Sequence, residues 1–355
     1  MYGVIYLLSI ILIIDHRSVP SRVFPLFWFT VMVCLSLSIR WEMIQSGQVL
    51  NDGDLSAYVY NMGVEKTLSY HLREPIFWYG SRYLYIVFGN PGLVFVFMDI
   101  ILFLTFYKSV GLFKTFFSKH INFHNVKYLY FSAFLFYPYI AGMHNHYRQI
   151  LAVTIAMCAF GIAEKKPRKA LFVFLISIAT HNGMVMLLPI LLLSGKRKIS
   201  TGVMTIAGLV TIITLFVPAY LGYFGYDGWS ELIRRFNDIG TSDIATGRAK
   251  MYLYLLLLTT FFIIILEYSF KARAQYLLIK VLICLTAIYF VGFLLFPNHA
   301  ASRVFFMVFT LFLPLTGLYV EIKFKTEPTV RLLYFHLSLV PLLGLRGDGL
   351  VYEFL

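Results

Sequence analysis

Two arginines are the residues of this sequence with the clearest chemical meaning. Arg148 begins the stretch Arg-Gln-Ile-Leu-Ala at 148–152, and Arg303 lies in Ser-Arg-Val-Phe at 302–305; each stands where an apolar run begins. The planar guanidinium group binds phosphate oxygens through two parallel hydrogen bonds. An ionisable side chain at the rim of a helical bundle is a candidate site residue. The two arginines therefore indicate an anionic substrate that carries phosphate.

Two other residues could move a proton. His181 follows an apolar arm and precedes Asn182 and Gly183, so its imidazole could act as a base or hydrogen-bond donor near neutral pH, or be a packed core residue. Asp54 ends the polar stretch 51–54, and its carboxylate could orient or deprotonate a hydroxyl group. Glu74 could contact substrate, or it could be the N-terminal charge of the helix that follows.

The elements that must position these residues are membrane helices. Of the 355 residues, 59% are hydrophobic and 13% are charged, whereas an ordinary soluble domain has about 25% charged residues. This composition excludes an ordinary cytosolic enzyme and a nucleic-acid reader. A spanning helix needs about 20 apolar residues, and we predict an all-α polytopic protein with a single membrane domain over 1–355. The apolar runs are 1–14, 23–39, 92–107, 128–142, 149–163, 171–193, 199–219, 249–268, 276–296, 303–320 and 331–345.

Lysine and arginine in the short loops predict the orientation of the chain, because such residues concentrate on the cytoplasmic side. Eighteen of the 30 basic residues lie in alternate loops, and this bias accounts for most of the net charge of +13. The predicted outer face then holds the loops 40–91 and 220–248. These loops still carry cations, some of which would lie among lipid headgroups. Arg40 and Arg248 are the cations that we expect to assist Arg148 and Arg303.

One apolar run does not fit a simple crossing. The basic clusters 165–169 and 196–198 flank the run 171–193, yet both clusters are predicted to be cytoplasmic. A re-entrant helical hairpin with its tip at 180–183 resolves the conflict; a single span with a polar kink is the alternative. Broken backbone at membrane depth is tolerated only where it is packed in protein or lines a wet cavity. With the hairpin, we predict about ten full crossings.

Five short motifs, taken together and in order, resemble the EpsG-like branch of the Wzy-type polymerases of O-antigen and other surface polysaccharides. The resemblance extends over roughly 40–310, and the ordered set is more specific than any single motif. The motifs are Asp54 with Tyr58, Glu-Pro-Ile-Phe at 74–77, Arg-Gln at 148–149 with Ala152, His-Asn-Gly at 181–183, and Ser-Arg at 302–303.

The resemblance implies a GT-C-like glycosyltransferase in the bacterial inner (plasma) membrane that uses no nucleotide, metal or other cofactor. Its substrates would be oligosaccharides linked to undecaprenyl diphosphate, joined on the periplasmic face. The expected partners are the lipid bilayer, a chain-length regulator and a flippase, and no nucleic acid. The implied catalytic residues are Asp54, His181, Arg148 and Arg303, with the arginines on the diphosphate and Asp54 favoured as base. The implied substrate-binding residues are Arg40, Tyr58, Glu74, Gln149 and Arg248.

Three other activities of the same pathway remain open. A lipid-linked oligosaccharide flippase would also use arginines against a diphosphate, but it should have about twelve spans in two related halves, and no repeat is visible in the sequence. A membrane acyltransferase would take its acyl donor from the cytoplasm, whereas these candidates face outward. An O-antigen ligase shares the donor and the chemistry, and the sequence does not separate it from a polymerase.

Overall fold

A computed structural model of the chain describes residues 1–15, 18–49, 54–63, 71, 74–112, 127–194, 243–269, 276–295 and 304–343. Every regular element in these ranges is a helix, and η4 and η5 are 3-10 helices. The elements are α1 (Tyr2–Ile14), α2 (Phe24–Ser46), α3 (Asp54–Gly63), α4 (Pro75–Phe88), α5 (Pro91–Leu112), α6 (Lys127–Ser132), η4 (Ala133–Leu135), α7 (Tyr137–His144), α8 (Tyr147–Ala163), α9 (Pro167–Thr180), η5 (Asn182–Leu187), α10 (Leu188–Leu193), α13 (Asp243–Ser269), α14 (Tyr276–Leu295), α16 (Phe305–Lys323) and α17 (Pro328–Leu343).

Five of these helices are long and apolar enough to cross a membrane: 24–46, 91–110, 249–268, 277–294 and 305–323. Three shorter apolar helices cover 2–14, 147–163 and 182–193. The prediction of an all-helical membrane protein is therefore confirmed for the part of the chain that the structure describes. The number of ten crossings and the GT-C-like architecture stay predictions, and the predicted span 199–219 lies outside the described residues.

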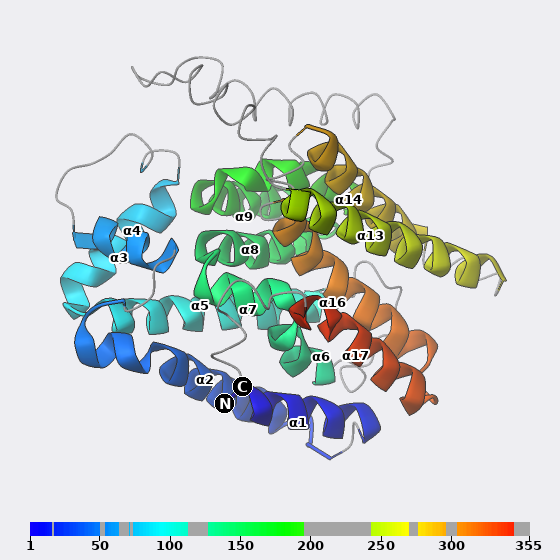
Figure 1. The fold of residues 1–355 in the computed structure, drawn as a ribbon, viewed down its shortest axis with the longest axis horizontal. Coiled ribbons are helices and arrows are strands. Elements are labelled where there is room, and N and C mark those ends of the chain that lie inside the picture. Colours follow the sequence, from blue (N-terminus) through cyan, green and yellow to red (C-terminus); the bar gives the residue numbers. More distant parts are fainter. Residues whose placement is uncertain are drawn as a thin grey trace.

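The helices that carry the candidate residues meet at one end of the bundle. Neighbouring helices in the series α2, α5, α8 and α9 pack side by side, and α4 packs against both α5 and α9 while α3 packs on α4. Figure 1 shows α3 and α4, in blue to cyan, beside one end of this stack. The start of α8 and the end of α9 are joined to residues of α3 and α4 by contacts described below. One end of the bundle is therefore built from four different segments.

Proline, glycine and asparagine fix the ends of α4. Pro75 occupies its first turn, where no N–H is needed. Gly89 follows the helix in the left-handed conformation with φ 63°, which glycine adopts without a steric penalty. The Asn90 amide then donates to the carbonyl of Ile44 at 2.8 Å, and its oxygen accepts from the N–H of Leu93 at 3.2 Å. The C-terminal end of α4 is thereby anchored to the ends of α2 and α5.

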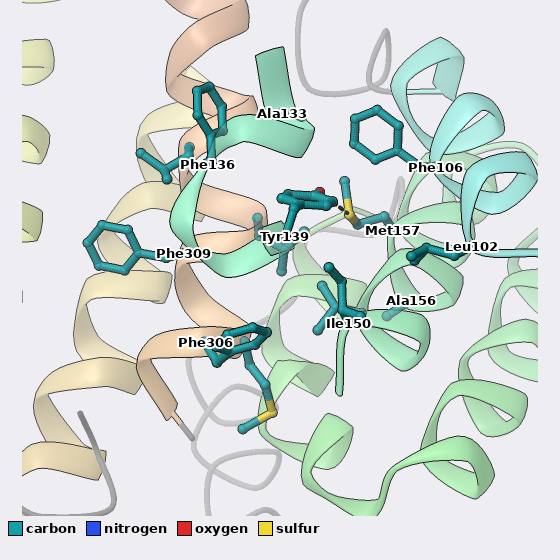
Figure 2. Close-up of a cluster of buried hydrophobic side chains, with 14 of the residues drawn as sticks. Leu102, Phe106, Ala133, Phe136, Tyr139, Ile150, Ala156, Met157, Phe306 and Phe309 are labelled. Carbon is teal, nitrogen blue, oxygen red and sulfur yellow. Dashed lines mark hydrogen bonds between the residues drawn. The ribbon is translucent and has the colours of Figure 1, made fainter. Parts of the chain in front are cut away.

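The helix α16 forms the centre of the described bundle. It is 94% buried over its apolar window, compared with 33–50% for the other four long helices. Pro314 within α16 has no N–H, so the carbonyl of Thr310 loses its helical partner. The Tyr139 hydroxyl donates to that carbonyl at 3.2 Å, which satisfies a polar group where no lipid could do so. Figure 2 shows the side chains around Tyr139, which include Leu102, Phe106, Ile150, Met157, Phe306 and Phe309.

Two apolar runs that the sequence analysis treats as single segments are interrupted in the structure. The run 128–142 forms α6, η4 and α7, with Phe136 in an extended conformation, because Pro138 cannot continue the preceding helix. The run 171–193 ends α9 at Thr180, passes through extended His181 (φ −151°, ψ 116°) and continues as η5 and α10. The predicted break at 180–183 is confirmed. The return of the second arm to the same membrane face stays a prediction.

Candidate functional site

The carboxylate of Glu74 is the centre of a buried polar cluster. Glu74 is the residue directly before α4 and is 4% exposed. Its Oε2 pairs with Nη1 of Arg148, from the first turn of α8. Its Oε1 lies 2.5 Å from Nδ1 of His181, at the end of α9, and 3.4 Å from the backbone N–H of Asn182. One carboxylate therefore holds a guanidinium and an imidazole from two other helices.

Aromatic rings surround the guanidinium of Arg148. Its Cζ lies 5.1 Å from the ring centroids of Tyr58 and Trp78 and 6.0 Å from that of Phe77. Its Nε also donates to the Tyr58 hydroxyl at 3.3 Å. Cation–π contacts of this kind hold a charged group without consuming its hydrogen bonds. Because 24% of the Arg148 side chain stays exposed, the guanidinium is fixed in place but still reachable.

Asp54 lies at the outer edge of this cluster. Its carboxylate is 49% exposed and its Oδ2 lies 3.5 Å from Nδ1 of His146. The Tyr58 hydroxyl points toward the same oxygen at 3.4 Å. The ring of His146 packs edge-on against Phe306 of α16, with 4.9 Å between the centroids. Tyr58 therefore links Asp54 to Arg148, and His146 links the cluster to α16.

The second ring nitrogen of His181, Nε2, lies close to Gly183. A Cβ atom at Gly183 would lie 3.0 Å from Nε2 of His181 and 3.3 Å from the sulfur of Met307. Real Cβ atoms rarely approach other atoms this closely. Gly183 is thus the residue that leaves room beside Nε2, between the turn after α9 and the first turn of α16.

The cluster keeps Glu74 ionised. Burial alone would raise the pKa of this carboxyl, but the hydrogen bonds and electrostatic interactions with His181 and Arg148 outweigh burial and lower it. Burial also raises the pKa of Tyr58 to about 12, against the opposing effect of Arg148. At neutral pH the site therefore holds a carboxylate at Glu74 and a neutral phenol at Tyr58.

The structure brings together Asp54, Tyr58, Glu74, Arg148 and His181 from the predicted set. Gln149 is buried beside Arg148 in the chain, and its Oε1 has no hydrogen-bond partner among the described residues. Arg303 lies outside the described residues, as does the side chain of Arg248. The next residues after Arg303 begin α16, whose Phe306 contacts His146. The roles expected for Arg303 and Arg248 stay predictions.

Arg40 lies inside the bundle rather than on an outer loop. It belongs to α2, and its Nε lies 3.1 Å from Oδ2 of Asp99 in α5, with both side chains almost completely buried. Ser36 donates to the same carboxylate oxygen at 2.8 Å, and Nη2 of Arg40 donates to the carbonyl of Met143 at 2.7 Å. The charge of Arg40 is therefore neutralised within the protein. This geometry gives no support to a contact between Arg40 and an anionic substrate.

The aromatic and histidine neighbours of the cluster were not predicted from the sequence. Trp78 lies one helical turn after Glu74, a spacing that brings side chains together on one face and that could have indicated its position. Nothing local in the sequence connects His146 to Asp54, which is 92 positions away in the chain. In the described part of the chain, no group of three or more His, Cys, Asp or Glu side chains is arranged to hold a metal ion.

Residues 25–343 match the model of the EpsG family. This range includes the whole Glu74 cluster and, apart from residue 24, every long apolar helix described above. No curated protein matches the chain, and no solved structure does.

Proposed function

The chain belongs to the EpsG family, and we propose that it is a bacterial polysaccharide polymerase of the inner membrane. The family consists of Wzy-type, polymerase-like membrane proteins. In our proposal the protein joins oligosaccharide repeat units linked to undecaprenyl diphosphate on the periplasmic face. The growing glycan on its lipid is the donor, and a single lipid-linked repeat unit is the acceptor.

The observation that carries this proposal is the partly exposed Arg148 beside His181, both held by one buried carboxylate. The leaving group of the reaction, a lipid diphosphate, carries about two to three negative charges, so catalysis requires fixed cations beside it. Arg148 is fixed by Glu74 and by three aromatic rings. It also lies in the first turn of α8, where the helix dipole favours anions. Arg303, directly before Val304 and α16, is proposed as the second cation.

The site must also accept a proton from the attacking hydroxyl group. The acceptor oxygen forms a bond to the anomeric carbon of the donor, and the bond from that carbon to the diphosphate oxygen breaks. The electron pair of the broken bond leaves with the lipid diphosphate. His181 and Asp54 are the groups in the cluster that can receive the hydroxyl proton.

The experiment is a surface-polysaccharide gel of a strain that lacks this gene, complemented at matched expression with wild type, Arg148→Ala or Arg82→Ala. Arg82 lies in α4 and its Nε donates to the carbonyl of Asn61, so Arg82→Ala is a control for the loss of an arginine outside the cluster. We expect the polymer ladder to collapse to core plus one repeat without the gene. Wild type and Arg82→Ala should restore it, and Arg148→Ala should not.

Each other outcome contradicts the proposal. Loss of even the single repeat would favour the flippase or ligase alternative, because the repeat would then not reach its carrier. An unchanged ladder would exclude polymerisation, and an acyltransferase would be tested next by analysing the acyl groups on the glycan.

A further inference from the structure

The contacts of Glu74 support a more specific assignment, which rests on the proposed polymerase activity. We propose that Glu74 is a positioning residue that presents Nε2 of His181 to the acceptor hydroxyl, so that His181, rather than Asp54, takes the hydroxyl proton. The same carboxylate fixes Arg148 beside the leaving group. Glu74 would thus set the relative positions of the base and the cation.

The contact with Glu74 fixes the tautomer of His181. A neutral imidazole carries its proton on one ring nitrogen, and the hydrogen bond of that nitrogen decides which. An ionised carboxylate only accepts hydrogen bonds, and Glu74 is held in its ionised form. The Nδ1 atom, 2.5 Å from Oε1 of Glu74, is therefore the protonated nitrogen. This leaves Nε2 with a free lone pair, which is the arrangement that a general base requires.

The position of Gly183 next to that lone pair supports the same assignment. Gly183 lies where any other side chain would begin 3.0 Å from Nε2. A hydroxyl group must approach within hydrogen-bond reach of a base, about 2.6–3.2 Å, before its proton is transferred. The missing Cβ at position 183 removes one obstacle to that approach. The two-residue spacing after the end of α9 thus places Gly183 next to Nε2 of His181.

Asp54 is less suited to the same task. Its carboxylate is about half exposed and interacts with His146 at 3.5 Å and the Tyr58 hydroxyl at 3.4 Å. A carboxylate that is solvated and hydrogen-bonded is a weak base. His181, in contrast, is 8% exposed and is held by the buried carboxylate of Glu74. Asp54 is therefore assigned to the edge of the site, where it holds Tyr58 and His146.

The proton balance of the step is simple. As the acceptor oxygen bonds to the anomeric carbon, its proton moves to Nε2, and His181 becomes an imidazolium ion. The carboxylate of Glu74 stabilises this ion without taking a proton itself. The proton then passes to water or to the departing diphosphate, which restores neutral His181 for the next addition.

This assignment predicts that Glu74 raises kcat but does not improve the binding of the donor. The negative charge of Glu74 beside Arg148 repels a diphosphate, so it does not contribute to donor affinity. In Glu74→Gln the side-chain oxygen must turn to Arg148, which has only donors, and the amide NH2 must then face Nδ1 of His181. Nδ1 would become the acceptor and Nε2 would carry the proton, which is the wrong tautomer for a base.

The test uses the full-length protein in detergent or nanodiscs with synthetic undecaprenyl-diphosphate-linked repeat units, and it measures kcat and the donor KM separately. For Glu74→Gln we expect kcat to fall about 100-fold or more, with a donor KM equal to or lower than that of wild type. Glu74→Asp, which keeps the charge, should recover part of kcat. Glu42→Gln, which changes an exposed carboxylate in α2, should match wild type.

Two further variants separate positioning from structure. Gly183→Ala should lower kcat while the thermal midpoint stays near that of wild type, because a methyl group blocks Nε2. In a His181→Ala background, Glu74→Gln should have little additional effect on kcat, because the residue through which it acts is absent.

The results distinguish failure of this assignment from failure of the proposed function. If wild type polymerises and Arg148→Ala does not, while Glu74→Gln keeps its kcat or only raises the donor KM, the positioning role is wrong and the polymerase stands. If Asp54→Asn loses as much kcat as His181→Ala, the base is wrongly assigned. If wild type does not join the repeat units at all, the proposed function itself fails.

Discussion

Two of the arginine–carboxylate pairs in the described part of the chain have surroundings that differ in an informative way. Arg40 and Asp99 are both almost completely buried, and Ser36, the carbonyl of Met143 and two aromatic rings complete their contacts. Arg148 and Glu74 are also paired, but the arginine stays 24% exposed. Glu74 is moreover shared with His181, whereas Asp99 pairs with a single cation in the described part of the chain.

The difference shows how burial separates a structural pair from a candidate site. A buried ion pair that is fully satisfied can only stabilise or specify the packing of its helices. A pair with one accessible member can exchange partners with a ligand. An arginine in an apolar stretch can therefore be structural, as Arg40 is, or accessible to a ligand, as Arg148 is. Of these two pairs, only Arg148–Glu74 can bind a substrate from outside the bundle.

The largest expected effect is the loss of activity when the charge of Arg148 is removed. Arg148→Met keeps a long side chain but removes the charge, and we expect polymerisation to fall more than about 100-fold because the leaving group loses a fixed cation. The thermal midpoint should fall less than at Arg40, because Glu74 keeps its contacts with His181 and the N–H of Asn182. Activity assays and thermal unfolding of the same detergent sample measure both. A large loss of stability with normal activity per folded molecule would show that Arg148 has a structural role instead.

The matched change in the Arg40–Asp99 pair should lower stability and leave activity unchanged. Arg40→Met leaves Asp99 buried without its cation, which costs about 3–5 kcal/mol of stability. We expect a clearly lower thermal midpoint and unchanged activity per folded molecule. The double variant Arg40→Met/Asp99→Leu should recover most of the stability, because no charge is left buried. If Arg40→Met abolishes activity while the fold stays intact, the Arg40–Asp99 pair is not purely structural.

The Glu74 pair should also differ in its response to acid. The folded-state pKa of Glu74 lies below the ordinary value of 4.5, because His181 and Arg148 outweigh the effect of burial. Its carboxylate therefore stabilises the fold above pH 4.5, and this stability is lost as the pH falls through the lower folded-state pKa. The thermal midpoints of wild type and Glu74→Gln should differ most near neutral pH and converge below 4.5. A pH-independent difference would contradict the lowered pKa.

The smallest expected effect concerns one hydroxyl group. Tyr58→Phe keeps the ring over Arg148 but removes the acceptor of its Nε–H, 3.3 Å away. A well-formed hydrogen bond to a charged group is worth about 1.5–3 kcal/mol, and this one is long at 3.3 Å, so a loss of activity of about tenfold is expected. Tyr60→Phe, on the same helix but strongly exposed, is the control. A loss as large as that of Arg148→Met would show that the hydroxyl itself takes part in the reaction.

The sequence predicted those parts of the site that depend on local pattern. The break at His181 followed from basic clusters on both sides of one apolar run, and Arg148 was identified because it begins such a run. The partners of Glu74 could not be predicted in the same way, because 74, 148 and 181 meet only through the packing of α4, α8 and α9. Arg40 was misplaced for a related reason: its position near a predicted helix end indicates an interface, and only the contact with Asp99 shows that it turns inward.

The central position of α16 also has a consequence for how the protein is made. Residues 305–323 are translated after α7, α8 and α14, on which α16 packs, and before α17, which also packs on it. At about 5–20 residues per second, α16 is complete on the order of ten seconds after α8. During that time Tyr139 lacks the carbonyl to which it later donates, and its aromatic neighbours face lipid or insertion machinery. Because α17 packs against α16, the chain reaches its final packing only after residues 328–343 have also been synthesised.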